Sequence, residues 1–160
     1  MILDLIALDN SAKVWIYQAD REFSYDELDE IRPMIFDFLD QWTSHQNMLM
    51  TYGNVFHRRF LAMFVDESLA GASGCSIDAS VRFVKQLESH FGVSLMGRDT
   101  VAYMIDEEIS TLPLNELGSA VSDGRLQADT FVFDNLVKNK DGFLKEWCKP
   151  INESWHKMFV

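Results

Sequence analysis

The sequence is short of cysteine, of basic side chains and of long apolar runs. It has only two cysteines in 160 residues, Cys75 and Cys148, which are too few for a disulfide framework and do not form a CxxC pair. The longest uninterrupted apolar run, Phe60–Val65, is far shorter than the roughly 20 residues of a membrane-spanning helix. Met1–Leu8 is apolar but is interrupted by Asp4 and lacks the basic flank of a secretory signal. We therefore expect reduced thiols, no membrane association and a cytoplasmic location.

Positive charge is also scarce. Lysine and arginine number 14 against 25 aspartates and glutamates, which gives a formal net charge of −11. Binding to nucleic acids and anionic membranes depends on Lys and Arg side chains that neutralise several phosphates at once. Here the basic residues are scattered, and Arg58–Arg59 is the only adjacent pair in the first half of the chain. The composition therefore argues against nucleic acid as a partner and favours solubility.

Motifs for common catalytic and cofactor chemistries are missing. The chain has no Gly-Lys pair, so the GxxxxGK[ST] loop of nucleotide hydrolases is absent. Gly71–Cys75 matches the GxSxG nucleophile elbow except at the fifth position, where cysteine replaces the required glycine. The four histidines show neither HExxH nor Cys/His ligand spacing. We expect no cofactor and no metal centre.

The chain does contain enough apolar residues for one core. Apolar residues make up 48% and charged residues 24% of the 160 positions, which is an ordinary globular composition. A chain of this length buries about 70% of its unfolded surface and needs neither disulfides nor a metal to fold. We expect a single domain over residues 1–160.

The elements of the first half are well marked. Val14–Tyr17 is rich in β-branched and aromatic residues and predicts a strand. A helix follows Ser24, whose hydroxyl is placed to cap it with Glu27 as the capping-box partner. Met48–Phe56 and Phe60–Val65 predict two strands in an antiparallel hairpin. The second of these shows no polar alternation, which is typical of a strand covered on both faces.

The second half alternates between helices and strands. A helix is predicted over Ile77–Phe91 and ends at Gly92, where a left-handed cap is common. Strands are predicted over Val101–Ile105 and Phe131–Val137, with a short helix opened by Pro113 between them. The tail contributes two further helical segments, Phe143–Trp147 and Trp155–Phe159.

The order of the first six elements is strand, helix, strand, strand, helix, strand, as in the ferredoxin-like split βαβ fold. We expect an α+β domain with one mixed, mainly antiparallel sheet of about five strands, followed by a C-terminal helix, strand and helix. The doubly apolar strands indicate that the later helices cover the second sheet face. A ribonuclease-H-like topology, in which the first helix lies outside the main pattern, is the alternative.

One loop combines residue types that can carry chemistry. Gly71–Asp78 joins a buried strand to a helix start, where unpaired amides and the helix dipole favour an anion. The candidate ligand-binding residues are Ser73, Gly74, Cys75, Ser76 and Asp78. We weigh a purely structural interpretation first, with Ser76 as a cap, Asp78 complementing the dipole and Cys75 as a small buried residue. A ligand-binding loop comes second, and catalysis by a Cys75 thiolate third.

A family resemblance is carried by three segments: Val14–Gln18 with its downstream helix, Val65–Asp78 and Ser154–Lys157. Together they resemble a small family of uncharacterised bacterial proteins of about this length, often labelled automatically as ABC-transporter ATPases. The resemblance covers essentially the whole chain and implies no established activity. The ATPase label requires a P-loop that this sequence lacks. The resemblance implies that the Val65–Asp78 loop and the Trp-containing tail belong together as hallmarks of the family.

The function is thus open among three classes. The first is a cytoplasmic binding or regulatory domain that holds a small anionic metabolite, or a carboxylate of a protein partner, at Gly71–Asp78. The second is an enzyme that uses Cys75 as a nucleophile, or strand-end carboxylates with a divalent metal. Those carboxylates are Asp20, Asp66, Asp106 and Asp134. The third is a structural subunit of a larger assembly, and the sequence does not select among oligomeric states.

Overall fold

A computed structural model describes residues 1–68 and 70–160 and contains two larger antiparallel sheets. The first has the order β1-β5-β4, with β1 (Lys13–Gln18), β5 (Phe60–Asp66) and β4 (Met50–Phe56). The second has the order β7-β6-β8-β9, with β7 (Glu108–Pro113), β6 (Thr100–Ile105), β8 (Phe131–Phe133) and β9 (Cys148–Pro150). A small ribbon pairs β2 (Thr43–Ser44) with β3 (Asn47–Met48). The predicted α+β class is confirmed.

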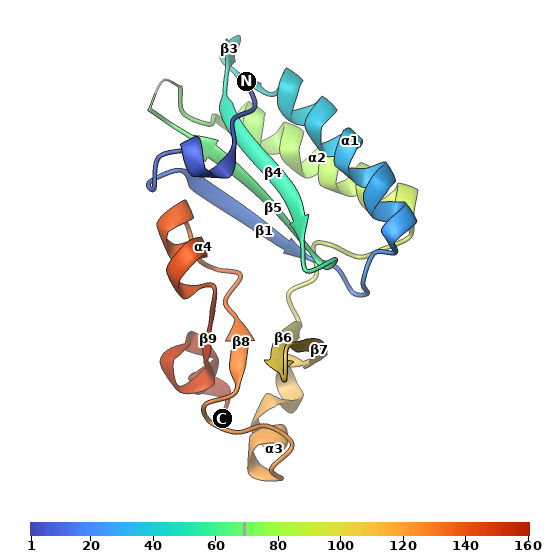
Figure 1. The fold of residues 1–160 in the computed structure, drawn as a ribbon, viewed down its shortest axis with the longest axis vertical. Coiled ribbons are helices and arrows are strands. Elements are labelled where there is room, and N and C mark those ends of the chain that lie inside the picture. Colours follow the sequence, from blue (N-terminus) through green and yellow to red (C-terminus); the bar gives the residue numbers. More distant parts are fainter. Residues whose placement is uncertain (69) are drawn as a thin grey trace.

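The helices are divided between the two sheets. The α-helices are α1 (Tyr25–Gln41), α2 (Gly74–Phe91), α3 (Leu117–Ser122) and α4 (Lys140–Glu146). The 3-10 helices are η1 (Leu5–Ala7), η2 (Leu114–Glu116), η3 (Ile151–Glu153) and η4 (Trp155–Phe159). Helices α1 and α2 cover one face of the first sheet (Figure 1), whereas α4 contributes to the hydrophobic cluster on its opposite face. Within the described residues, none of the helices is both long and apolar enough to cross a membrane.

Local capping interactions fix the ends of the two long helices. Ser24 caps α1 as predicted: its Oγ accepts from the Glu27 amide at 3.1 Å, and Glu27 Oε1 accepts from the Ser24 amide at 2.9 Å. Arg21 also donates to both carboxylate oxygens of Glu27, and these bonds lower the pKa of Glu27 to about 2. Gly92 ends α2 with a φ of 64°, the left-handed conformation that favours glycine.

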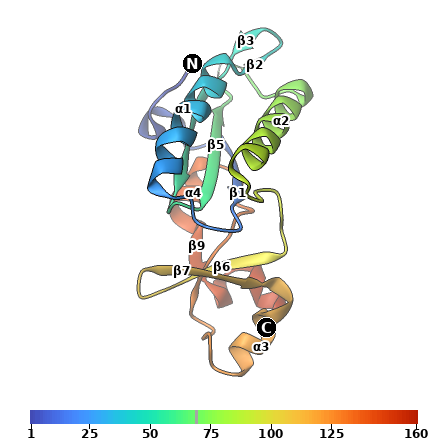
Figure 2. The same ribbon diagram turned by 90° about the vertical axis from the view of Figure 1, so that its right-hand side faces the viewer.

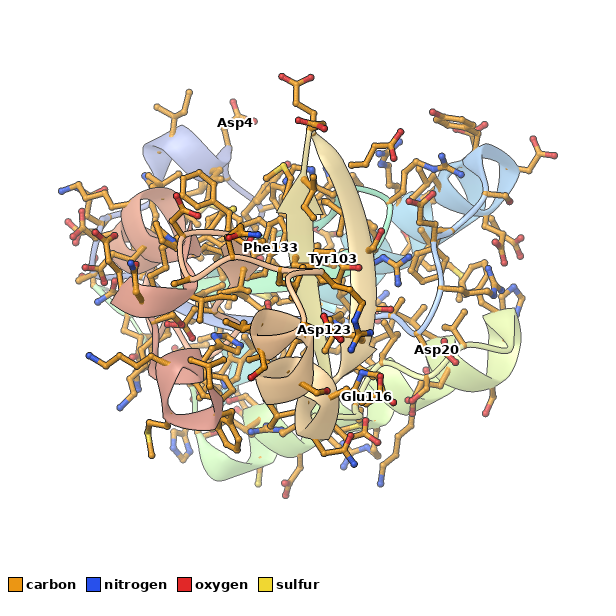
Figure 3. All side chains as sticks on the ribbon, turned by 90° about the horizontal axis from the view of Figure 1, so that it is seen from below. Asp4, Asp20, Tyr103, Glu116, Asp123 and Phe133 are labelled. Carbon is orange, nitrogen blue, oxygen red and sulfur yellow. The ribbon has the colours of Figure 1, made fainter. Side chains whose placement is uncertain are left out.

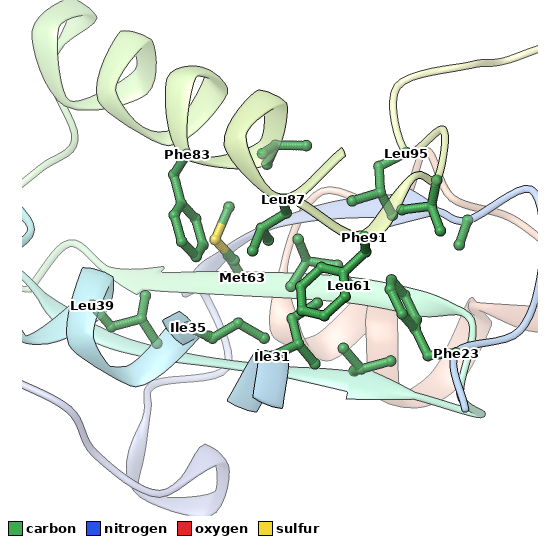
Figure 4. Close-up of a cluster of buried hydrophobic side chains, with 14 of the residues drawn as sticks. Phe23, Ile31, Ile35, Leu39, Leu61, Met63, Phe83, Leu87, Phe91 and Leu95 are labelled. Carbon is green, nitrogen blue, oxygen red and sulfur yellow. The ribbon is translucent and has the colours of Figure 1, made fainter. Parts of the chain in front are cut away.

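Strand β5 separates two hydrophobic clusters, because every one of its seven residues is buried. Its alternation sends Leu61, Met63 and Val65 toward α1 and α2, where they meet side chains such as Ile35 and Leu87 (Figure 4). The other three apolar side chains of the strand point the opposite way, into a cluster shared with residues of β6, β8 and α4. The strand is therefore covered on both faces, as its apolar sequence predicted.

The expectation of one five-stranded sheet was wrong. The first three strands take the ferredoxin-like order, but β6 pairs with β7 and β8 instead of with β1. The physical reason is a hairpin that the sequence analysis missed, in which Asp106 and Glu107 form a two-residue turn with φ of 52° and 66°. The ribonuclease-H-like alternative was also wrong, since α1 packs on β4 within the main pattern. Figure 2 shows β6 and β7 running across the molecule below the first sheet.

Candidate functional site

The structure uses the serines of the predicted loop to start α2. The helix begins at Gly74, three residues before the predicted start, and Ser73 is its N-cap, not Ser76. Ser73 Oγ accepts from the Ser76 amide at 3.2 Å, and Ser76 Oγ accepts from the Ser73 amide at 2.5 Å. The two hydroxyls therefore complete a capping box and are already occupied within the protein.

The other residues of this loop do not converge. Gly74, Cys75 and Asp78 are exposed, whereas Ser76 is buried and its carbonyl accepts a hydrogen bond from Trp42 Nε1 at 2.8 Å. The structural interpretation of Cys75 as a small buried residue was thus wrong. None of the five candidate residues lines either of the two main cavities found in the described part of the chain.

The strand-end carboxylates have separate surroundings. Asp20 accepts from the Ser94 amide, Asp66 accepts from the Asp9 and Ser68 amides, and Asp134 pairs with Lys149 at 2.9 Å. Asp106 lies in the β6–β7 turn. Among the described residues, no three His, Cys, Asp or Glu side chains gather in a group that could hold a metal ion. The two-metal alternative gains no support from this arrangement.

A cleft lies instead between β1 and the second sheet. It consists of two adjoining cavities of about 300 Å³ and about 450 Å³ that share five lining residues: Ile16, Tyr17, Arg98, Asn135 and Leu136. The smaller cavity is mostly apolar and extends to Leu95, Phe133 and the tail residues Trp155 and His156. The larger cavity is more open and reaches Ile77 in the first turn of α2. A concave, largely apolar space with a few convergent polar groups is the usual form of a ligand site.

Side-chain amides connect the two sheets across this cleft. Trp147 Nε1 donates to Asn135 Oδ1 at 2.9 Å, and Asn135 Nδ2 donates to Gln18 Oε1 at 2.9 Å. Gln18 Nε2 in turn donates to Thr100 Oγ1 at 3.2 Å. These bonds join residues up to 117 positions apart in the sequence. They fix the relative positions of the cleft walls, so the polar groups of the cleft are in place before a ligand binds.

The charges that border the cleft have one sign. Lys13, Arg98 and Lys138 are among its lining residues, and no carboxylate is among those that the structure places there. Lys13 pairs with Glu67 at 2.9 Å, but within the described chain the side chains of Arg98 and Lys138 make no hydrogen bond or ion pair. By contrast, exposed carboxylates are spread around the outside of the molecule, as Figure 3 shows for Asp4, Asp20, Glu116 and Asp123. The cleft is therefore a local cationic site on an acidic protein.

Two titratable groups in the cleft wall are uncharged near neutral pH. Burial raises the pKa of the Tyr17 phenol, and the nearby Arg98 charge offsets only part of this effect. Burial lowers the pKa of His156 to about 4, and its Nδ1 lies 2.6 Å from Ser154 Oγ. The ring of Trp155 stacks on that of His156 with centroids 3.8 Å apart. Neither group therefore adds charge to the cleft wall.

The sequence analysis did not identify this cleft. Its walls come from four segments within residues 13–18, 95–101, 133–138 and 155–156, together with Ile77 and Leu114, and no short motif links them. The one available indication was the family resemblance, which singled out the strand Val14–Gln18 and the tail Ser154–Lys157. Both of these segments contribute to the cleft wall. Comparisons of the chain with protein-family models, with curated proteins and with solved structures find no match, so family membership stays a prediction.

Proposed function

We propose that this protein is a binding domain that holds an anionic ligand with an apolar body in the cleft between β1 and the second sheet. The observation that carries the proposal is the charge of the cleft wall. In a chain with a formal net charge of −11, the lining residues that the structure describes include three cations and no carboxylate. We thus keep the anionic ligand that was predicted from the sequence, and we propose the cleft as its binding site instead of Gly71–Asp78.

The chemistry of the walls narrows the ligand class. The Arg98 guanidinium presents several N–H donors in a planar fork that matches a carboxylate or phosphate. The smaller cavity, at about 300 Å³, has room for a small apolar group beside Phe133, Leu136 and Trp155. The enzyme alternative has less support, because Cys75 is exposed away from the cleft. A cytoplasmic location stays a proposal from composition.

The test is a thermal-shift measurement with phenylacetate and phenyl phosphate, and with neutral phenylacetamide as the uncharged control. A ligand at 100 times its Kd stabilises the folded state by about 2.7 kcal/mol. For a chain of this size each kcal/mol raises Tm by roughly 2–4 °C. We expect the acids to raise Tm by several degrees, and phenylacetamide to have a much smaller effect.

Matched variants assign the effect to the cleft. Arg98→Gln should abolish most of the shift, whereas Arg82→Gln, which removes an exposed arginine of α2 outside the cleft wall, should leave it unchanged. The proposal is wrong if neither acid raises Tm by more than phenylacetamide does. It is also wrong if the shift is the same in the Arg98 and Arg82 variants.

A further inference from the structure

Strand β1 is an edge strand, and part of its outer edge is unpaired. The Val14 amide donates to the Lys138 carbonyl at 3.1 Å, so the main-chain groups of Val14 point away from β5. Because main-chain groups alternate along an antiparallel strand, those of Ile16 and Gln18 point the same way. At the far end, the Asp20 amide donates to the Ser94 carbonyl at 3.0 Å. Between these two hydrogen bonds, the outward N–H and C=O groups of Ile16 have no backbone partner within the described chain.

This unpaired edge lies in the cleft. Trp15 and Tyr17 are on the β1 face that packs against α1 and α2, and Val14 and Ile16 are on the opposite face. All four residues line the larger cavity. Side chains from both faces of β1 border the same cavity. The cavity must therefore extend around the outer edge of β1, and the main chain of this strand forms part of its wall.

We propose that the ligand is the carboxyl-terminal end of an extended segment of a partner protein, which adds to β1 as a short strand. This inference rests on the proposed function and specifies its ligand. An extended peptide complements an unpaired strand edge, because its main chain offers the same alternation of donors and acceptors. The peptide runs parallel to β1, and two of its residues bond to Ile16: one carbonyl accepts from the Ile16 N–H, and the N–H two residues further on donates to the Ile16 carbonyl.

The remaining features of the cleft favour a chain end over a passing segment. Lys138 and Ser94 close the edge on both sides, so a continuous chain has no path along it in either direction. A terminal carboxylate pairs with Arg98, and an apolar last side chain occupies the cavity of about 300 Å³. Lys138, whose side chain is unpaired within the described chain, borders the more open cavity and favours acidic residues before the terminus.

The experiment measures binding of the peptide Ac-Glu-Glu-Ala-Leu to the full chain by calorimetry. The free acid should bind at least tenfold more tightly than the same peptide with a C-terminal amide, because the amide removes the charge that Arg98 recognises. The main-chain nitrogens of the peptide are methylated one at a time. Methylation of the nitrogen whose N–H donates to the Ile16 carbonyl should weaken binding at least tenfold, since it removes this hydrogen bond. Arg98→Gln should weaken binding to a similar extent, and Arg82→Gln should not.

The hydrogen-exchange rate of the Ile16 amide measures directly whether the strand edge is paired. Peptide binding should slow exchange of the Ile16 amide at least tenfold, whereas the Tyr17 amide, which faces β5, should change little. If phenylacetate binds in an Arg98-dependent way but the peptide does not, the inference is wrong and the proposed function stands. Equal affinity of the acid and amide peptides, or unchanged Ile16 exchange on binding, also overturns it. If no acid binds at all, both proposals fail.

Discussion

Replacing Asp134 by asparagine or alanine should separate the effect of its charge from that of its hydrogen bonds. This carboxylate is only 7% exposed and immediately precedes the cleft residues Asn135 and Leu136. Its Oδ2 lies 2.9 Å from Lys149 Nζ, and its Oδ1 accepts from Trp155 Nε1 at 2.9 Å and from the Leu136 amide at 3.0 Å. It therefore ties β9 and the tail to the segment that forms one cleft wall.

The two substitutions should differ in magnitude. Asparagine keeps an oxygen that can accept from Trp155 and Leu136, and loses only the charged bond to Lys149. Charge-assisted hydrogen bonds contribute about 1.5–3 kcal/mol, and the Lys149 side chain is 20% exposed, so we expect a loss at the low end, about 1.5 kcal/mol. Alanine removes the acceptor for all three donors in a largely buried site, so we expect a loss of about 3–4 kcal/mol.

Urea denaturation followed by tryptophan fluorescence measures both losses. With an m value of about 2 kcal/mol/M, the midpoint should fall by roughly 0.7 M for Asp134→Asn and by roughly 1.5–2 M for Asp134→Ala. Asp129→Ala is the matched control, because Asp129 is exposed and its side chain makes no hydrogen bond within the described chain. A loss for Asp134→Ala as small as that of the control, or equal losses for the two Asp134 variants, would refute the reasoning.

The pH dependence of the Asp134→Asn effect is a second readout of the same bond. Burial on its own raises the pKa of Asp134, but hydrogen bonds from Lys149, Trp155 and the Leu136 amide outweigh it and hold the pKa below its ordinary value. A carboxylate with a lowered folded-state pKa stabilises the protein fully above its unfolded pKa of about 3.9. This stabilisation is lost as the pH falls through the lowered folded value. The stability difference between wild type and Asp134→Asn should therefore be constant from pH 7 to 5 and shrink below pH 4.

Three further predictions concern single side chains. Ser73→Ala should lower the unfolding free energy by about 1 kcal/mol in urea, and Ser73→Gly by less, because only the cap of α2 is lost; equal losses would contradict this account. Gly53→Ala should lower the unfolding free energy by about 1–3 kcal/mol in the same assay, since a Cβ there would lie 3.1 Å from Leu39 Cδ1. An unchanged urea midpoint would show that the neighbouring core side chains move to accommodate the methyl group. Iodoacetamide at pH 7.5 should modify exposed Cys75 faster than Cys148, whose pKa is raised by burial, and peptide mapping that finds equal rates would contradict this difference in environment.

Features that depend on neighbouring residues could be predicted from the sequence. Ser24 and Glu27 form their capping box, and Gly92 has the left-handed φ that its position indicated. The apolar run of β5 correctly indicated a strand buried on both faces. In each case the decisive interaction joins residues a few positions apart or reflects the burial of one continuous segment. Such interactions leave a pattern that a single sequence displays.

The second sheet shows why the rest could not be predicted. Its β6–β7 turn uses Asp106 and Glu107 at positive φ, where Asn-Gly or Asp-Gly would have marked a hairpin. Pro113 does precede a short helical segment as predicted, because it is the N-cap of η2, but it is also the last residue of β7, a strand that was not predicted. Whether β6 joins β1 or pairs with β7 and β8 depends on competition between a long-range pairing with β1 and a local hairpin with β7 to which β8 is added. The composition of either strand alone does not decide it.

The cleft poses the same difficulty more strongly. Gln18 bonds to both Thr100 and Asn135, so its role depends on two contacts more than 80 positions away in the sequence. Arg98 lies in an irregular segment, where nothing in its neighbours distinguishes it from other exposed arginines. The Gly71–Asp78 loop attracted attention because its small residues are contiguous. Contiguity identified the start of a helix, whereas the cleft is assembled from distant segments.

The acidity of the chain and its cationic cleft act over different distances. At physiological ionic strength the Debye length is about 8 Å, so exposed carboxylates that lie farther than this from the cleft contribute little to the field at Arg98. Partly buried Tyr17 and apolar neighbours such as Ile16 lower the local screening, and the unpaired Arg98 and Lys138 then dominate the interaction with a bound anion. The net charge of −11 acts instead on approaching molecules and slows the encounter of an acidic ligand with the protein. Net charge and site charge of opposite sign therefore favour a ligand whose few negative charges lie close together beside an apolar side chain over an extended polyanion.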